Sequence, residues 1–263
     1  MKHTKIYLGT NLKMYKNIRD TVRYLQDLEQ YTKDIDRNLT EIFVFPSYTA
    51  LSATVQSVNQ EYIKIGAQNM HWEEQGQFTG EISPLMLKEL NIDIIEIGHS
   101  ERRQLFGETN LDLNKKVISA IQHDFTSLLC IGETLEEKNF GISDEVLRIQ
   151  LKTGLYHMEA GFLKHLWIAY EPVWAIGVNG IPASAGYAQQ KHRVIKETLY
   201  DLFGMESCTI PVLYGGSVNQ ENATELICQP DIDGLFIGRS AWDAASFNTM
   251  IRKILQVCIK QQH

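Results

Sequence analysis

The chain has 263 residues, with 25 Lys+Arg against 32 Asp+Glu and a formal net charge of −7. Hydrophobic residues make up 44% and charged residues 22%, a globular composition that excludes a disordered chain. The acidic balance disfavours nucleic acid or an anionic membrane as a partner, but it leaves open a small anionic ligand in a local pocket. No apolar run approaches the roughly 18 to 20 residues of a membrane span.

Short apolar runs alternate with longer amphipathic segments along the whole chain. Several runs are almost continuously apolar, which is typical of strands that are buried on both faces of a parallel sheet. In chain order, the runs that predict strands are 6–9, 42–45, 63–68, 92–97, 127–131, 166–170, 210–214 and 235–238. The segments that predict helices are 17–32, 48–57, 83–90, 110–123, 143–154, 184–203, 220–228 and 244–259.

These strand-then-helix units predict an α/β fold, a closed (β/α)8 TIM barrel in which residues 1–263 form a single domain. An open doubly wound sheet is the alternative, and it usually needs fewer strands. In a TIM barrel the active site lies at the mouth formed by the carboxyl ends of the strands. The residues directly after each strand therefore carry the prediction of function.

A histidine follows the fourth predicted strand. His99 precedes Ser100, which we predict to be a helix N-cap. The dipole at a helix start disfavours the charged imidazolium, and a neutral ring can polarise a carbonyl oxygen without giving up a full proton. The alternative is a core histidine that is hydrogen-bonded to its surroundings.

Glu171 and Lys13 are the charged candidates at the mouth. Glu171 ends an apolar strand beside Pro172 and Trp174, where a partly desolvated carboxylate would have a raised pKa and act as a general base. Its alternatives are to cap a following helix or to pair with Lys13. Lys13 follows the first strand, together with Asn11, and could neutralise a phosphate or a developing enolate oxygen.

Glycine-containing turns follow the sixth, seventh and eighth predicted strands. We expect the backbone amides around Gly177, Ser217 and Gly238 to hold phosphate oxygens, with the dipole of a short helix after the last strand. Arg239 either adds charge at the phosphate or points outward into a surface ion pair. The long polar loop after the third strand, residues 69–81, is either an oligomer contact or a solvated excursion.

Motifs for metals, nucleotides and secretion are not found in the sequence. There is no HExxH, paired CxxC, EF-hand, GxGxxG or P-loop pattern, so we expect neither a metal nor another cofactor. The start of the chain has no signal-peptide pattern, and we expect a cytoplasmic protein. The four cysteines lie in apolar contexts, which predicts buried thiols in a reducing compartment; they are Cys130, Cys208, Cys228 and Cys258.

Seven motifs resemble the triosephosphate isomerase family, and the match runs over essentially the whole chain. They are Asn11-Leu12-Lys13-Met14, Gly66-Ala67-Gln68-Asn69, Phe78-Thr79-Gly80-Glu81, Gly98-His99-Ser100-Glu101-Arg102-Arg103, Cys130-Ile131-Gly132-Glu133, Tyr170-Glu171-Pro172-Val173-Trp174-Ala175-Ile176-Gly177 and Tyr214-Gly215-Gly216-Ser217-Val218.

The resemblance implies an isomerase that moves a proton through a cis-enediol intermediate. Glu171 would shuttle the proton, as in that family's known pairing of a glutamate base with a neutral histidine. His99 would serve the two oxygens of the enediol, and Lys13 would steady the substrate and the enediolate. Asn11 would help hold Lys13 and the oxygens. Glu101 is implied as a supporting residue that does not touch the substrate, and we expect the same of Ser100.

The resemblance also implies a moving segment and a partner subunit. Residues 172–183 would form a lid that closes on the phosphate and excludes water, which would otherwise allow the enediol to eliminate phosphate. Thr79 and its loop would insert into a second subunit, so a homodimer is implied.

Three segments depart from the common family pattern, namely 69–72, 179–184 and 237–242. They resemble a branch of the family that acts on L-erythrulose 1-phosphate in erythritol-type catabolism. That substrate is dihydroxyacetone phosphate with one hydrogen of the last carbon replaced by CH₂OH, so the same proton transfer would give D-erythrulose 4-phosphate. The alternatives are a glycolytic triosephosphate isomerase with altered loops and a non-catalytic barrel that binds a sugar phosphate.

Overall fold

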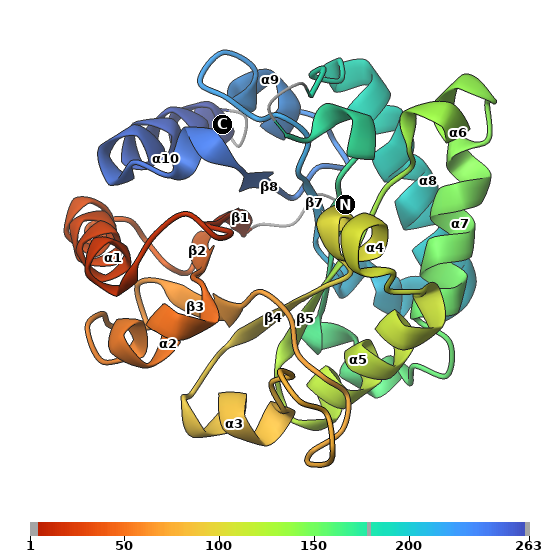
Figure 1. Ribbon diagram of the computed structural model, residues 1–263. Coiled ribbons are helices and arrows are strands. Elements are labelled where there is room, and N and C mark those ends of the chain that lie inside the picture. Colours follow the sequence, from red (N-terminus) through yellow and green to blue (C-terminus); the bar gives the residue numbers. More distant parts are fainter. Residues whose placement is uncertain (1–4, 178–179, 261–263) are drawn as a thin grey trace.

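The protein is described by a computed structural model that covers residues 5–177 and 180–260. Eight parallel strands close into a barrel in the order β1 to β8, with β1 paired to both β2 and β8 (Figure 1). The strands are β1 (Ile6–Asn11), β2 (Thr40–Phe45), β3 (Lys64–Ala67), β4 (Ile94–Ile97), β5 (Thr126–Ile131), β6 (Leu166–Tyr170), β7 (Val212–Tyr214) and β8 (Gly234–Ile237). The predicted closed barrel is confirmed.

The helices surround the strands on the outside (Figure 1). The α-helices are α1 (Ile18–Thr32), α2 (Tyr48–Val55), α3 (Pro84–Glu89), α4 (Ser100–Phe106), α5 (Asn110–Gln122), α6 (Leu135–Asn139), α7 (Ser143–Gly154), α8 (Ala185–Phe203), α9 (Ala223–Ile227) and α10 (Ala244–Lys260). Short 3₁₀ helices are η1 (Ala160–His165), η2 (Val173–Ala175), η3 (Gly204–Thr209) and η4 (Arg239–Ala241).

The ends of the helices follow from local capping. Thr109 and Thr134 each form a capping box with an acid three residues later, which fixes the starts of α5 and α6. Helix α9 begins at Ala223 rather than at residue 220, because the side chain of Asn219 accepts the N–H groups of Glu221 and Asn222 and forms a turn there. Helix α6 was not among the predicted helices, and α4 was expected only as a helix start at Ser100, without a range.

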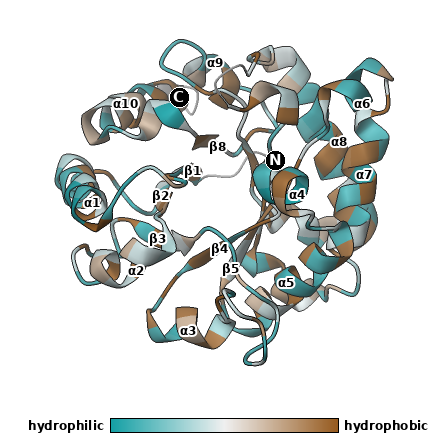
Figure 2. Cartoon of the chain, viewed as in Figure 1, coloured by the Kyte–Doolittle hydropathy of each residue, from teal (hydrophilic) through white to brown (hydrophobic). Residues whose placement is uncertain are grey.

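The interior of the barrel is a cluster of strand side chains alone. Rings of Phe43 and Phe45 fill it, and glycines on the neighbouring strands leave them room. A Cβ added at Gly9 would lie 2.1 Å from Phe43, and one at Gly66 would lie 2.2 Å from Phe45. A second apolar layer joins the outer faces of the strands to the helices, and in Figure 2 helices α7 and α10 accordingly carry both hydrophobic and hydrophilic colours.

The cysteines correct one prediction. Cys130 and Cys258 are buried, but Cys228 is only partly buried and Cys208 is exposed. Cys208 lies in the surface turn η3, so the apolar residues that follow it in sequence belong to the buried strand and not to its own surroundings. Among the described residues, no helix is both long and apolar enough to cross a membrane.

His192 on α8 makes the stability of the fold depend on pH. Its ring is fully buried against Tyr170 and Tyr214, and burial lowers its pKa from 6.5 to about 3. The unfolded chain therefore binds a proton that the folded chain refuses, and the free energy of unfolding falls by about 1.4 kcal/mol per pH unit from this residue below pH 6.5.

We therefore expect the melting temperature of His192→Leu to rise relative to that of the unsubstituted protein as the pH falls from 7 to 4. The control is His157→Asn, at an exposed histidine whose left-handed backbone asparagine adopts readily. A difference in melting temperature between His192→Leu and the unsubstituted protein that does not change with pH would contradict this assignment.

Candidate active site

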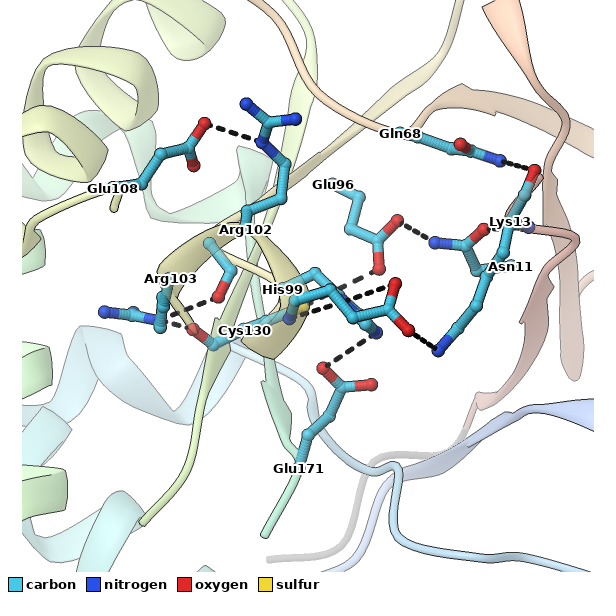
Figure 3. A network of polar contacts seen from close by, with 12 residues as sticks. Asn11, Lys13, Gln68, Glu96, His99, Arg102, Arg103, Glu108, Cys130 and Glu171 are labelled. Atoms are coloured by element: carbon cyan, nitrogen blue, oxygen red, sulfur yellow. Dashed lines mark hydrogen bonds and ion pairs between the residues drawn. The ribbon is translucent and has the colours of Figure 1, made fainter. Parts of the chain in front are cut away.

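The carboxyl ends of β1, β4 and β6 bring the predicted polar residues together (Figure 3). Nζ of Lys13 lies 2.6 Å from Oε1 of Glu101, and Nε2 of His99 lies 3.9 Å from Oε2 of Glu171. Asn11 lies at the end of β1 beside them. The predicted meeting of a lysine, a histidine and a glutamate at one mouth is therefore what the structure shows.

Lys13 lies in a tight turn that several side chains hold in place. Its backbone has a φ of 50°, in the left-handed region that lysine rarely adopts. Oδ1 of Asn11 accepts the N–H of Lys13 at 2.6 Å, and Nε2 of Gln68 donates to the carbonyl of Lys13 at 3.0 Å. Trp242 donates to the carbonyl of Asn11 at 2.9 Å. These hydrogen bonds hold the strained backbone of Lys13 in place, and the backbone in turn sets the direction in which the lysine side chain leaves the turn.

The structure corrects the predicted cap at α4. The N-cap is His99 itself, because its Nδ1 accepts the N–H of Glu101 at 3.1 Å, and Ser100 is the first helical residue. An Nδ1 that accepts carries no proton, so the neutral ring holds its proton on Nε2, which faces Glu171. Burial lowers the pKa of His99, and the nearby Lys13 ammonium also lowers it, against the opposing charges of Glu171 and Glu101.

Glu171 has a buried carboxylate with an oxygen left over. Its side chain is nearly inaccessible, and Oε2 has no hydrogen-bond partner among the described residues. A Cβ added at Gly215, at the end of β7, would lie 2.7 Å from Cγ of Glu171, so glycine is required there to admit the carboxylate. The alternative pairing of Glu171 with Lys13 does not occur, since Lys13 pairs with Glu101.

The pair with Lys13 accounts for Glu101. Its hydrogen bond to the Lys13 ammonium holds the pKa of Glu101 below its usual range in spite of partial burial. At the same time the backbone N–H of Glu101 donates to Nδ1 of His99. Glu101 thus orients both the lysine and the imidazole.

Sequence reasoning missed Glu96. This residue is fully buried on β4, and it accepts a 2.5 Å hydrogen bond from Nδ2 of Asn11 (Figure 3). Burial raises its pKa well above the usual range. A single acid among the isoleucines of residues 94–97 was the signal that was available.

Glu133 belongs to one of the seven family motifs, but no role was predicted for its carboxylate, which is buried. It accepts hydrogen bonds from Tyr170, from Nε1 of Trp174 at 2.9 Å and from the Tyr187 hydroxyl at 2.8 Å. Trp174 belongs to the segment predicted to form a lid, so Glu133 fixes where that segment leaves β6.

The predicted phosphate residues lie on neighbouring turns. Ser217 has a φ of 48°, and its hydroxyl donates to the carbonyl of Ala175. Gly177 has a φ of 88°, and there is open space beside both Gly177 and Gly238. Arg239 is exposed at the start of η4 and makes no ion pair with any described residue. Residues 178 and 179 of the predicted lid lie outside the described residues.

The loop after β3 has a stiff base and an exposed tip. The ring of His71 lies 4.3 Å from that of Trp72 and 4.1 Å from that of Phe78, and Thr79 is exposed at the tip. Under the loop, Nζ of Lys116 bonds to the side chain of Asn69. The base of the loop is therefore packed, and its tip is exposed.

A barrel mouth with a lysine, a neutral imidazole and an unpartnered carboxylate defines the class of protein, an isomerase of phosphorylated sugars. The chain belongs to the triosephosphate isomerase family, whose sequence model matches residues 6–254.

Relatives and a solved structure agree with this family. L-erythrulose-1-phosphate isomerase of Rhizobium etli is 48% identical over 252 residues, which cover 95% of this chain and 92% of that protein. L-erythrulose-1-phosphate isomerase of Rhizobium meliloti is 43% identical and covers 97% of this chain and 98% of its own length. The structure of triosephosphate isomerase from Bartonella henselae is 30% identical, with a TM-score of 0.86, and the match covers 96% of this chain and 99% of that one.

We expect His99 to be mainly neutral at pH 6.5, the ordinary pKa of histidine, because burial lowers its pKa. ¹⁵N NMR of the labelled protein should show an Nδ1 without a proton and a protonated Nε2 at pH 6.5, and His99→Gln should remove and so assign these resonances. An imidazolium signal from His99 at pH 7 would overturn the tautomer described above.

Proposed function

We propose that this enzyme converts L-erythrulose 1-phosphate to D-erythrulose 4-phosphate through a cis-enediolate. The observation that carries the proposal is the unpartnered Oε2 of Glu171, 3.9 Å from Nε2 of His99. The choice of substrate rests on relatives of 43% and 48% identity over nearly the full chain that are named L-erythrulose-1-phosphate isomerase.

Glu171 is the base that moves the proton. It takes the proton from C3, the electron pair forms the C2–C3 double bond, and the carbonyl at C2 becomes an enediolate oxygen. The proton of the C3 hydroxyl passes to the C2 oxygen by way of Nε2 of His99. The same carboxyl then returns its proton to C2, and the carbonyl forms at C3. One base serves both carbons because they are adjacent and present the same face.

His99 and Lys13 stabilise the charge that develops on the oxygens. Nε2–H of His99 donates to the two enediol oxygens in turn, and a neutral imidazole matches an enediol in acidity better than an imidazolium does. The ammonium of Lys13, supported by Asn11 and Glu101, lies opposite the developing negative charge.

The backbone amides around Gly177, Ser217 and Gly238 bind the phosphate, and Arg239 adds a positive charge at its outer side. The open space at two of these glycines and the unpaired state of Arg239 in the described part of the chain support this role. The segment 172–183 closes over the phosphate and excludes water from the enediolate.

We also propose that the enzyme is a cytoplasmic homodimer. Thr79 and the loop around it insert into the second subunit, which the ordered base and exposed tip of the loop support. The free state of all four cysteines fits a reducing compartment.

Triosephosphate isomerisation is the second candidate, because the Bartonella henselae structure shares the fold at 30% identity. The machinery needs no change between the two substrates, and only the space beside the distal carbon must differ. The higher identity to the tetrulose-phosphate enzymes favours the first candidate. A non-catalytic barrel is disfavoured. A buried carboxylate oxygen without a partner costs stability, and a protein that only binds its ligand has no need for such a group.

The purified enzyme should have a kcat/KM on L-erythrulose 1-phosphate at least about tenfold above that on glyceraldehyde 3-phosphate, the equivalent of about 1.4 kcal/mol in transition-state binding. The two reactions are measured with coupled assays on one preparation. A preference for the triose, together with complementation of a strain that lacks triosephosphate isomerase, would establish the second candidate instead.

Glu171→Asp should lower kcat by about 100-fold or more, because the shorter side chain withdraws the carboxylate by about 1 Å from the substrate carbons. Binding of inorganic phosphate, measured by calorimetry, should persist. Glu136→Asp, at an exposed position on α6, is the matched control and should leave kcat unchanged. Unchanged turnover of Glu171→Asp would refute the assigned base.

A further inference from the structure

Strand β4 carries a carboxyl group for which the proposed reaction has no use. Glu96 is fully buried, and it lies two residues after Ile94, a member of the cluster inside the barrel. Side chains two apart on a strand share a face, so Glu96 points into the barrel directly below the mouth. Burying an acid is costly, and this one lies beside the proposed catalytic groups, so its place in the barrel calls for an explanation.

The contacts of Glu96 fix the orientation of the Asn11 amide. Oε2 of Glu96 accepts from Nδ2 of Asn11 at 2.5 Å, while Oδ1 of Asn11 accepts the N–H of Lys13 at 2.6 Å. The two bonds together allow only one of the two amide orientations. The second hydrogen on Nδ2 has no partner among the described residues and is available to a substrate oxygen.

The other oxygen of Glu96 faces a thiol. Its Oε1 lies 4.0 Å from Sγ of Cys130 on β5 (Figure 3). The acid is therefore joined to β1 on one side and to β5 on the other. Both oxygens of Glu96 accept, Oε2 from the Asn11 amide and Oε1 from the thiol of Cys130.

Burial and the surrounding charges favour the neutral form of the Glu96 carboxyl group. Burial raises the pKa of Glu96 first, and the carboxylates of Glu171 on β6 and Glu101 on α4 raise it further. The ammonium of Lys13 and the hydrogen bond from Asn11 act in the opposite direction without reversing the shift. Two nearby buried carboxyls do not both ionise readily, which also favours a neutral Glu96.

We propose that Glu96 is a positioning residue. As an uncharged carboxyl group inside the barrel, directly below the mouth, it holds the Asn11 amide with one N–H toward the substrate. The inference rests on the proposed function for the identity of the reaction. It implies that glutamine, which keeps one accepting oxygen and carries no charge, can replace Glu96. An apolar side chain of similar volume cannot.

The test compares Glu96→Gln and Glu96→Met, with Ile94→Met as the control for a methionine on the same face of the same strand. On L-erythrulose 1-phosphate, Glu96→Gln should keep kcat within about threefold, and Glu96→Met should lose about 10- to 100-fold in kcat with little change in KM. Ile94→Met should match the unsubstituted enzyme. Melting temperatures of all variants show which of them are folded.

A double-mutant cycle tests whether Glu96 acts through Asn11. In an Asn11→Ala background, Glu96→Met should cost less than about threefold more in kcat, since the group that it positions is gone. The pH profile of kcat/KM should be the same for Glu96→Gln and the unsubstituted enzyme. In difference infrared spectra at neutral pH, the C=O band of a protonated buried carboxyl should be present and should vanish in Glu96→Gln.

Three results would overturn the proposal: full turnover by Glu96→Met, a loss in Glu96→Gln as large as in Glu96→Met, or an undiminished loss in the Asn11→Ala background. If the unsubstituted enzyme prefers the triose phosphate, the proposed substrate fails, and the same comparisons are made on the triose. If neither substrate turns over, the infrared band alone decides, and its absence rejects the neutral Glu96.

Discussion

Because all eight strands run parallel, their carboxyl ends lie on the same side of the barrel, and closure brings these ends into one ring. The site depends on this constraint. Lys13, His99 and Glu171 are separated by more than 150 residues of chain in total, yet each needs only to follow its own strand to reach the others. The aromatic filling of the barrel, with Phe43 and Phe45 seated over glycines, keeps that closure tight. A small displacement in one strand would therefore be passed to the reacting groups.

Three carboxyl groups lie close together in the site, and their surroundings give each a different part. Glu101 is paired with an ammonium, which lowers its pKa, and it orients that lysine. Glu96 is fully buried with an amide and a thiol, and burial raises its pKa. Glu171 is buried with one oxygen unpartnered. The net charge of −7 is a property of the whole chain, and it does not reveal the Lys13 ammonium at the mouth.

The barrel and the residues around its mouth could be predicted because both signals are local. An apolar run such as 166–170 predicts a buried strand from its own residues. The barrel topology then places the polar residue after the strand at the mouth. What could not be predicted depends on which way a side chain turns. His99 takes the capping position expected of Ser100 by lending its own Nδ1, and Cys208 is exposed although apolar residues follow it. Glu96 needed the strand register, because one residue of shift would have turned it toward the helices.

A single base can serve a four-carbon ketose because the chemistry is confined to two adjacent carbons. In the proposed reaction, proton removal and proton return occur on one face, so Glu171 does not need to move between them. The oxygens on those carbons exchange roles as carbonyl and hydroxyl, which suits a neutral His99 that can donate to either. In the proposed complex the phosphate is held by the turns after β6, β7 and β8, on elements apart from β1 and β4. Space for a further hydroxymethyl group can therefore vary without disturbing either the base or the phosphate grip.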